Sequence, residues 1–259
     1  MLLEPERQDR KLNRLTYWFP AVQDSLQPQE YPETKILWTD CNLLSLIYGI
    51  VPNCMKQFRA QLSSACLSVG LPCFLRTDEL SGKHSWSETC YVEHVSNLPR
   101  HIARLVEESE LADIMGLPID VWVVRKMLRA WRDGLSFRAF NGMPMTSERR
   151  LFVRNGELIC HHPYWPPASI KNPDCCDWES KLEKLNTCST NELSLLQEKT
   201  KHLSRHPLLS KHAWSVDWLY CPPPDDSWYL IDMALAEMSW HWPDCGDWAT
   251  YQNQAGAEA

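Results

Sequence analysis

The sequence predicts an α+β fold, built from antiparallel sheets with helices on their flanks. Two observations predict it. Short apolar runs recur along the chain, and two pairs of them are joined by tight-turn sequences, which is the pattern of β-hairpins. Two or three stretches with helical periodicity alternate with these runs. The 259 residues are enough for one large domain or two small ones, with an ample core.

Charge and hydropathy argue against two classes of protein. The net charge is -7 and no basic stripe occurs, so we expect no nucleic acid as partner. The first residues are charged and lack the apolar core of a signal peptide. The longest apolar run, Leu43–Val51, is too short to span a bilayer. We therefore expect a cytoplasmic protein that does not enter a membrane.

The cysteines indicate the same compartment. There are eleven, irregularly placed and odd in number, and no CxxC occurs. This pattern disfavours a disulfide framework or a zinc finger. We expect reduced thiols, most of them buried.

The amino-terminal third begins with a polar, proline-bearing segment, residues 1–30, which we expect to lie on the surface. A short strand is predicted at Lys35–Trp38. Cys54–Val69 has a single apolar stripe at helical spacing. Gly70 and Pro72 follow it directly and are typical of a helix end.

A strand at Leu71–Arg76 and a return strand at Cys90–Val95 enclose a polar loop, Thr77–Trp86. The loop carries small residues and Lys83. Backbone N–H groups and the ammonium group would give it a positive field, which favours a phosphate cover. It is not a Walker A loop, because no GxxxxGK[ST] sequence occurs.

A second helix is expected at Asn97–Leu111, where Pro99 stands in the first turn. The run at 119–124 is apolar throughout and predicts a buried strand. Arg125 and Lys126 follow it at once.

Two apolar strands around Asn155-Gly156 predict a hairpin at Glu148–Cys160 with a type I′ turn. Arg150 lies near the start of its first strand. The following segment, HHPYWPP, is aromatic and looks exposed. Its adjacent histidines, His161 and His162, would point to opposite faces of a strand, which disfavours joint metal binding.

The carboxy-terminal third begins with a polar, helical stretch at 171–212. Ser189 and Glu192 form a candidate capping box there. The tail after Trp248 is polar, and we expect it to fray.

Two apolar runs, WSVDWLY and WYLIDMA, each carry one acid, Asp217 and Asp232. The turn sequence PPPDD separates them, so a hairpin with a carboxylate on each strand is expected. Buried carboxylates are costly without a positive partner. Their convergence suggests a divalent cation, most simply Mg²⁺; the alternative is two ordinary strand-end acids.

Taken together, these stretches resemble the ATP-grasp superfamily, in the clade named for two arginines and one lysine. The clade occurs in phage and bacterial proteins, and a eukaryotic assembly chaperone of translation initiation factor two is related to it. The resemblance covers roughly residues 30–242. The stretches that carry it are YPETKIL, FLRTDELSGKHSW, VWVVRKML, SERRLFVRNGELI (an E-x-R-x-F-V strand), SVDWLY and WYLIDMA.

The resemblance implies antiparallel sheets that clasp ATP, with flanking helices. It implies an N-terminal subdomain at 1–72, a nucleotide-binding subdomain with a flexible loop at 73–126, and a C-terminal subdomain with the metal-ligand strands at 127–259.

The resemblance also implies roles for residues on the nucleotide side. Arg76, Lys83 and Arg125 would neutralise phosphate oxygens. Val124, Arg125 and Lys126 would lie on the hinge strand beside the adenine.

On the metal side, Asp217 and Asp232 would hold Mg²⁺. The family pairs the second acid with an asparagine two residues on, where this chain has Ala234. Glu237 is a candidate substitute, and the second metal is in doubt.

The implied activity is that of an ADP-forming carboxylate–amine ligase acting through an acyl phosphate. Arg150 and Lys83 are the candidate catalytic residues. The substrates would be a small-molecule or peptide carboxylate and an amine. The alternative is a chaperone or binding module that uses ATP to grip a protein partner. A metal-dependent hydrolase is disfavoured, because no HxH or HExxH pattern occurs.

Overall fold

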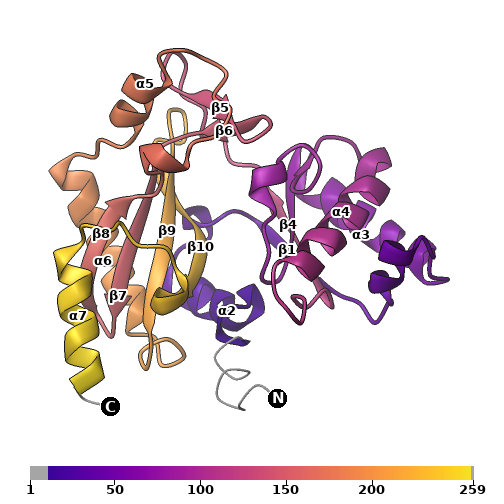
Figure 1. The fold of residues 1–259 in the computed structure, drawn as a ribbon, viewed down its shortest axis with the longest axis horizontal. Coiled ribbons are helices and arrows are strands. Elements are labelled where there is room, and N and C mark those ends of the chain that lie inside the picture. Colours follow the sequence, from indigo (N-terminus) through magenta and orange to yellow (C-terminus); the bar gives the residue numbers. More distant parts are fainter. Residues whose placement is uncertain (1–10, 258–259) are drawn as a thin grey trace.

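The structure, a computed structural model, describes residues 11–257, with side chains to residue 252. Two four-stranded antiparallel sheets dominate it (Figure 1). Sheet A has the order β1-β4-β2-β3. Its strands are β1 (Thr34–Trp38), β2 (Cys73–Thr77), β3 (Tyr91–Val92) and β4 (Val121–Lys126).

Helices α3 (Met55–Val69) and α4 (Leu98–Leu111) cover one face of sheet A (Figure 1). In α3, Phe58, Leu62 and Cys66 recur every four residues and pack in one core with the sheet. Both predicted helices are therefore confirmed, within one residue at the start.

Sheet C has the order β10-β9-β7-β8. Its strands are β7 (Glu148–Arg154), β8 (Glu157–Pro163), β9 (Ala213–Cys221) and β10 (Ser227–Leu235). Both predicted hairpins are present. At the first turn Asn155 and Gly156 have φ of 45° and 84°, as a type I′ turn requires. α6 (Thr190–Ser204) packs on this sheet and begins with the predicted capping box of Ser189 and Glu192.

The amino-terminal segment contains a buried helix, α2 (Leu15–Ser25). The expectation of a polar surface segment is wrong for these residues, while residues 1–10 lie outside the described part. Leu15, Trp18, Phe19 and Val22 follow the i, i+3, i+4, i+7 pattern and join the core of sheet C. Pro20 inside the helix conceals this pattern in the sequence.

A small third sheet pairs β5 (Phe137–Ala139) with β6 (Met143–Met145) and packs beside α5 (Trp178–Leu185). At the other end of the chain, α7 (Gly246–Ala257) lies along β8 (Figure 1). The expectation of a frayed tail is thus wrong for the described residues, because Trp248 and Tyr251 pack against the sheet.

Two cysteines correct the expectation of reduced thiols. Cys41 and Cys54 form a disulfide, and the other nine cysteines are free. Within residues 11–257, no helix is long and apolar enough to cross a membrane.

Sheets A and C lie side by side with the chain crossing between them after β4 (Figure 1). All four strands of sheet A come from residues 34–126, and the other strands come from residues beyond 136. A cavity between the sheets is lined by several of the residues singled out above, among them Arg76, Lys83, Arg125, Asp217 and Asp232.

Candidate functional site

A cavity of about 330 Å³ lies between sheets A and C. Its wall includes residues of β2 and β4, the crossing segment 127–131, and residues of β7, β9 and β10. Six basic residues line it, Arg76, Lys83, Arg125, Lys126, Arg129 and Arg138, against three acids, Glu148, Asp217 and Asp232. The wall is therefore positive by three charges in a chain with net charge -7, which suits an anionic ligand.

Asp217 and Asp232 are directly opposite each other on β9 and β10. The predicted convergence of the two carboxylates is thus present in the sheet register. Like charges at such a position destabilise a sheet unless cations compensate them. Two arginines do so here.

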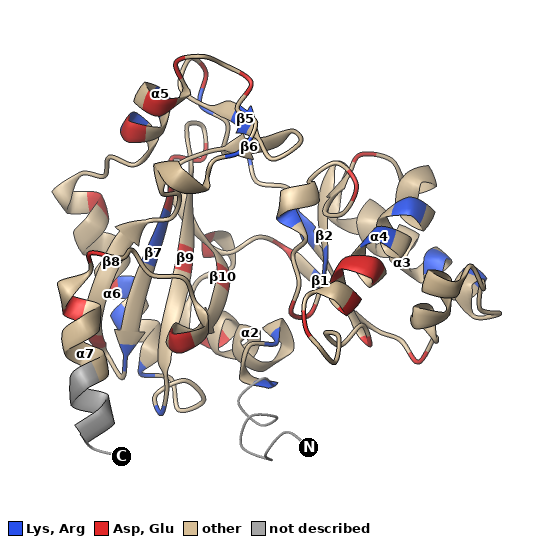
Figure 2. Cartoon of the chain, in the orientation of Figure 1, with Lys and Arg blue, Asp and Glu red and all other residues tan. Residues whose placement is uncertain are grey.

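Arg150 lies opposite Asp217 on the neighbouring strand β7. Its Nε and Nη2 donate to the two carboxylate oxygens of Asp217 at 2.7 and 2.8 Å. The side chains are only 16% and 5% exposed. Burial works against the charge of Arg150, but Asp217 outweighs it and raises the pKa of the guanidinium. Figure 2 shows the basic residues of β7 beside the acidic residue of β9.

Arg76 reaches across from sheet A. Its Nη1 donates to Oδ1 of Asp232 at 2.9 Å, so this ion pair connects β2 with β10. Arg150, Asp217, Asp232 and Arg76 therefore form one row of two ion pairs whose acids are adjacent at its centre, and we call it the charge row.

Arg125 is a second buried cation from sheet A. It donates to Thr34 Oγ1 and to the backbone oxygen of Ile231, but its Nη2 is buried with no hydrogen-bond partner among the described residues. Burial, with the neighbouring charge of Arg76, lowers its pKa. An unpaired buried guanidinium N–H is costly, and an anion in the cavity would satisfy it.

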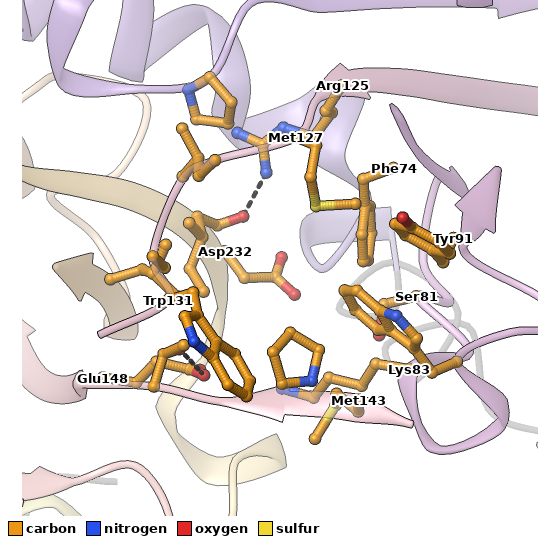
Figure 3. Close-up of a pocket in the computed structure, with 18 of the residues that line it drawn as sticks. Phe74, Ser81, Lys83, Tyr91, Arg125, Met127, Trp131, Met143, Glu148 and Asp232 are labelled. Carbon is orange, nitrogen blue, oxygen red and sulfur yellow. Dashed lines mark hydrogen bonds between the residues drawn. The ribbon is translucent and has the colours of Figure 1, made fainter. Parts of the chain in front are cut away.

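Lys83 points into the cavity from the loop between β2 and β3 (Figure 3). Its Nζ donates to the Tyr164 hydroxyl at 2.5 Å and lies 4.8 Å from the Trp165 ring centre. Burial acts to lower its pKa, but Tyr164 and Glu148 outweigh this, and the pKa is raised. Lys83 is therefore a cation held in place by aromatic rings.

Glu148 is a cavity residue that the sequence analysis did not single out. It is buried, accepts from Trp165 Nε1 at 3.0 Å, and its pKa is raised mainly by burial. The signal was present, because Glu148 and Arg150 are two apart on a strand and share a face. Trp165 is 4% exposed, so the exposure expected for the HHPYWPP segment is wrong at this residue.

The apolar part of the wall is aromatic. Phe74, Trp86 and Tyr91 pack together, with Trp86 and Tyr91 stacked at 5.7 Å. Figure 3 shows Phe74 and Tyr91 on one side of the cavity, across from Asp232 and Glu148 on the other. Such a wall suits a flat ring system.

The remaining candidates are placed differently. Lys126 lines the cavity, whereas Val124 points to the core between sheet A and its helices. Glu237 is exposed and lies beyond β10, outside the cavity lining. Arg150 is not itself a lining residue and meets the cavity through Asp217.

Among solved structures, C-terminally truncated Cdc123 from Schizosaccharomyces pombe supports the fold. It matches with a TM-score of 0.53 at 12% identity, over 91% of this chain and 87% of that one. Two further structures match at lower TM-scores. D-cycloserine synthetase DcsG gives 0.49 at 15% identity, over 96% of this chain and 70% of that one. D-alanine–D-alanine ligase from Helicobacter pylori gives 0.47 at 12% identity, over 92% of this chain and 53% of that one.

A search by sequence among curated proteins finds no match. A family model matches residues 51–242, and its description is ATP-grasp domain, R-two-K clade family 3. The matched range includes every strand of sheets A and C except β1, and every lining residue of the cavity except Pro32. The chain therefore belongs to the ATP-grasp domains, in family 3 of the clade named for two arginines and one lysine.

Proposed function

We propose that the cavity binds ATP with Mg²⁺, and that the chain is an ADP-forming carboxylate–amine ligase. The observation that carries this proposal is the charge row, Arg150–Asp217–Asp232–Arg76, which faces further cations in one cavity. Membership of the ATP-grasp family supports the nucleotide as ligand.

The phosphates are assigned to the basic part of the wall. The unpaired Nη2 of Arg125 needs an anionic partner, and Arg76 lies close enough to depress the pKa of Arg125. A phosphate between them would relieve this repulsion. Lys83, on the loop between β2 and β3, would contact the same phosphate.

The residues present fit a hard cation. Two carboxylates face the cavity from adjacent strands, and Mg²⁺ in nucleotide sites is held by one or two carboxylates together with phosphate oxygens. When bound, the metal would neutralise charge on the phosphates. We assign Asp217 and Asp232 to this role and leave out the exposed Glu237.

Binding would exchange partners within the charge row. Arg76 now neutralises Asp232, and a cation at Asp232 would release Arg76 to the phosphates. Arg150 holds Asp217 through two hydrogen bonds, so separating this pair would cost more free energy than separating Arg76 from Asp232.

The adenine is assigned to the aromatic wall of Phe74 and Tyr91 and to the crossing segment 127–131. This segment leaves β4 and connects the two sheets, so its backbone is close to a ligand between them. We therefore propose that sheet A with its helices, residues 34–126, and sheet C with α2 packed on it provide the two sides of the clasp, and the subdomain limits at 72 and 126 remain part of this proposal.

In the proposed reaction, an oxygen of the substrate carboxylate attacks the γ-phosphorus, the bond to ADP breaks, and an amine then displaces phosphate from the acyl phosphate. Such chemistry depends on positioning and charge neutralisation. Lys83 and Arg150 both contact Tyr164, and we assign to them the role of orienting the groups that react. Neither substrate is identified by the cavity.

A second candidate is an ATP-binding protein that grips a protein partner without ligation. Ala234 favours it, because the residue that would complete a second metal site is absent two positions after Asp232. The two-point contact between Arg150 and Asp217 also favours it, because it leaves one acid fully neutralised.

Calorimetric titration with a non-hydrolysable ATP analogue tests the nucleotide site. We expect Mg²⁺ to tighten binding by roughly tenfold or more relative to EDTA. Arg76→Ala should weaken it, whereas Arg59→Ala, an exposed arginine on α3, should not. Equal affinity with and without Mg²⁺ would contradict the assignment of Asp217 and Asp232 as metal ligands.

Nucleotide turnover separates the two candidates. A ligase should release ADP and phosphate in amounts equal to the amide formed, and only when a suitable carboxylate and amine are present. A partner-gripping protein should bind the analogue and give no product with any carboxylate–amine panel. Tight binding with no turnover would therefore favour the second candidate.

A further inference from the structure

A second cluster of chemically active side chains lies away from the cavity, on the outer edge of sheet C. Cys160, His162, His241 and Cys245 each offer one ligand atom, and these atoms lie within 4.8 Å of one another. All four residues are buried or partly buried. No other group of three or more metal-type side chains converges in the part of the chain that the structure describes.

The fold brings these side chains together from two segments. Cys160 and His162 are two residues apart on β8, so they project from the same face of the strand. His241 and Cys245 belong to the segment between β10 and α7, which lies against that face. His161, between the first pair, points away, which is why adjacent histidines were a misleading signal.

One of the donor atoms lacks a partner, because Nε2 of His162 is buried with no hydrogen bond among the described residues. Nε2 of His241 lies 3.2 Å from Sγ of Cys160. Two ligand atoms of a tetrahedral zinc site, one nitrogen and one sulfur, would be roughly 3.5 Å apart, given the usual bond lengths. This nitrogen–sulfur pair thus already has nearly the required spacing, and all four ligand atoms lie within 4.8 Å of one another.

We propose that Cys160, His162, His241 and Cys245 form a structural zinc site. Two thiolates balance the charge of Zn²⁺ and two neutral imidazoles complete a closed tetrahedral set. The surroundings suit it, because Phe152 and Trp248 pack on the His241 ring at centroid distances of 3.5 and 4.0 Å and limit access of water.

The site would fasten the segment Ser239–Cys245 to the edge of sheet C. That segment is also anchored by Trp242 Nε1, which donates to the backbone oxygen of Pro163 at 3.0 Å, and by the hydroxyl of Ser239, which lies 2.6 Å from that of Ser215 on β9. One residue before His241, the backbone oxygen of Trp240 accepts from Nη1 of Arg150 at 3.4 Å. Zinc would therefore also help to fix Trp240, whose backbone oxygen contacts Arg150 of the charge row. The zinc proposal stands whether or not the cavity binds ATP.

The metal content of the full chain tests the proposal. After purification without affinity metals, we expect one zinc per chain by elemental analysis, and stoichiometric release of zinc when the thiols are modified. Co²⁺ in its place should give the strong visible absorption of a tetrahedral site with thiolate ligands. Chelation should lower the Tm.

Single variants test whether zinc depends on the four proposed ligands and not on neighbouring residues. Cys245→Ser and His241→Ala alter the segment after the last strand and are expected to leave sheet C folded while abolishing stoichiometric zinc. His161→Ala and Cys176→Ser are the controls, because one lies beside the ligands on the opposite face and the other is a free exposed cysteine.

Two results would overturn the proposal. One is a wild-type chain that takes up no zinc from a micromolar supply while its thiols titrate as free. The other is a disulfide between Cys160 and Cys245 in protein purified under reducing conditions. Equal loss of zinc in the His161→Ala control would also count against it, since the metal would then lie elsewhere.

Discussion

At the scale of single residues, each acid proposed for the metal already has a cation beside it. Asp217 is neutralised by Arg150 and Asp232 by Arg76. The two pairs differ in burial, because Asp232 is 34% exposed and Asp217 only 5%. The consequences of losing one partner should therefore differ as well.

Asp232→Asn should weaken binding of the Mg²⁺ complex of an ATP analogue and leave stability almost unchanged. The amide oxygen still accepts from Arg76, but a ligand charge is lost where Mg²⁺ depends on few carboxylates. Calorimetry with and without Mg²⁺ measures this, and Asp225→Asn in the turn of the same hairpin is the control. An unchanged Mg²⁺ dependence would count against Asp232 as a ligand.

Arg150→Ala should destabilise the unliganded chain by about 3–5 kcal/mol, because it leaves the buried carboxylate of Asp217 unpaired. Millimolar Mg²⁺ should restore part of this loss, since the carboxylate regains a cation. Urea unfolding with and without Mg²⁺ is the measurement. Arg154→Ala, at the exposed end of the same strand, controls for loss of an arginine. If Mg²⁺ does not restore any of the lost stability, the ion pair of Arg150 and Asp217 has a structural role only.

His101 gives a dependence on pH. Burial, with the nearby charge of Arg100, lowers its pKa below the ordinary value of 6.5, although the backbone oxygen of Thr89 partly opposes this. The unfolded chain then binds a proton that the folded chain does not, so stability is lost as the pH falls below 6.5.

His101→Asn should reduce the slope of the unfolding free energy against pH in this window, because asparagine keeps a donor for Thr89 but does not titrate. Urea unfolding at several pH values measures the slope. Identical slopes for the two proteins would show that His101 does not carry the effect.

Residue placement was predictable wherever strand alternation decides it. Glu148 and Arg150 share a face, and Arg125 points to the cavity while Val124 points to the core. If we had applied this rule to every strand, Glu148 would have joined the candidate cavity residues and Val124 would have been assigned to the core. The ion pair between Arg76 and Asp232 was not predictable, because it joins residues 156 apart and depends on how two sheets are placed.

At the scale of elements, the amino terminus of helix α2 is capped by a residue from another segment of the chain. The preceding residue, Arg14, provides no cap. Instead Asp78, just after β2, accepts from the backbone N–H of Thr16 at 2.8 Å and from its hydroxyl at 2.7 Å. Asp78 also binds Arg14, so a single buried carboxylate joins the helix to sheet A.

Asp78→Ala should therefore cost about 3–5 kcal/mol, the range for breaking a buried charge pair. It should also increase hydrogen exchange selectively in α2 and in the loop that carries Lys83. Asp40→Ala, an acid in the loop after β1, is the control. A loss of stability with no local change in exchange would mean that Asp78 does not act through these two segments.

Elements were predictable where their signals are local. The Asn155-Gly156 turn and the Ser189–Glu192 capping box both operate within four residues and are present as predicted. α2 was missed because its cap lies 62 residues away and Pro20 interrupts its pattern. The disulfide between Cys41 and Cys54 has no distinctive spacing, and only the folded loop shows that the two are neighbours.

At the scale of the whole molecule, side chains of sheet A hold sheet C across the cavity. Arg76 reaches Asp232, and Arg125 reaches the backbone of Ile231. A ligand between the sheets would add contacts to both sides at once. Its binding energy should therefore appear in the stability of the entire chain.

ATP analogue with Mg²⁺ at one hundred times its Kd should stabilise the chain by about 2.7 kcal/mol, or raise the Tm by roughly 5–10 °C. EDTA should remove most of the shift. Thermal unfolding followed by tryptophan fluorescence measures it. A shift that is the same in EDTA would indicate binding without the metal, and no shift at all would contradict the nucleotide site.

The anchoring of α2 also sets an order of events during synthesis. The helix packs in the core formed with β9 and β10, and Asn13 accepts a hydrogen bond from the backbone N–H of Leu235, 222 residues later. A ribosome that has made the helix must make nearly all the remaining chain before the helix can dock on β9 and β10. Until then the core around Trp18 and Phe19 is incomplete, so the nascent chain needs shielding from aggregation until β10 emerges.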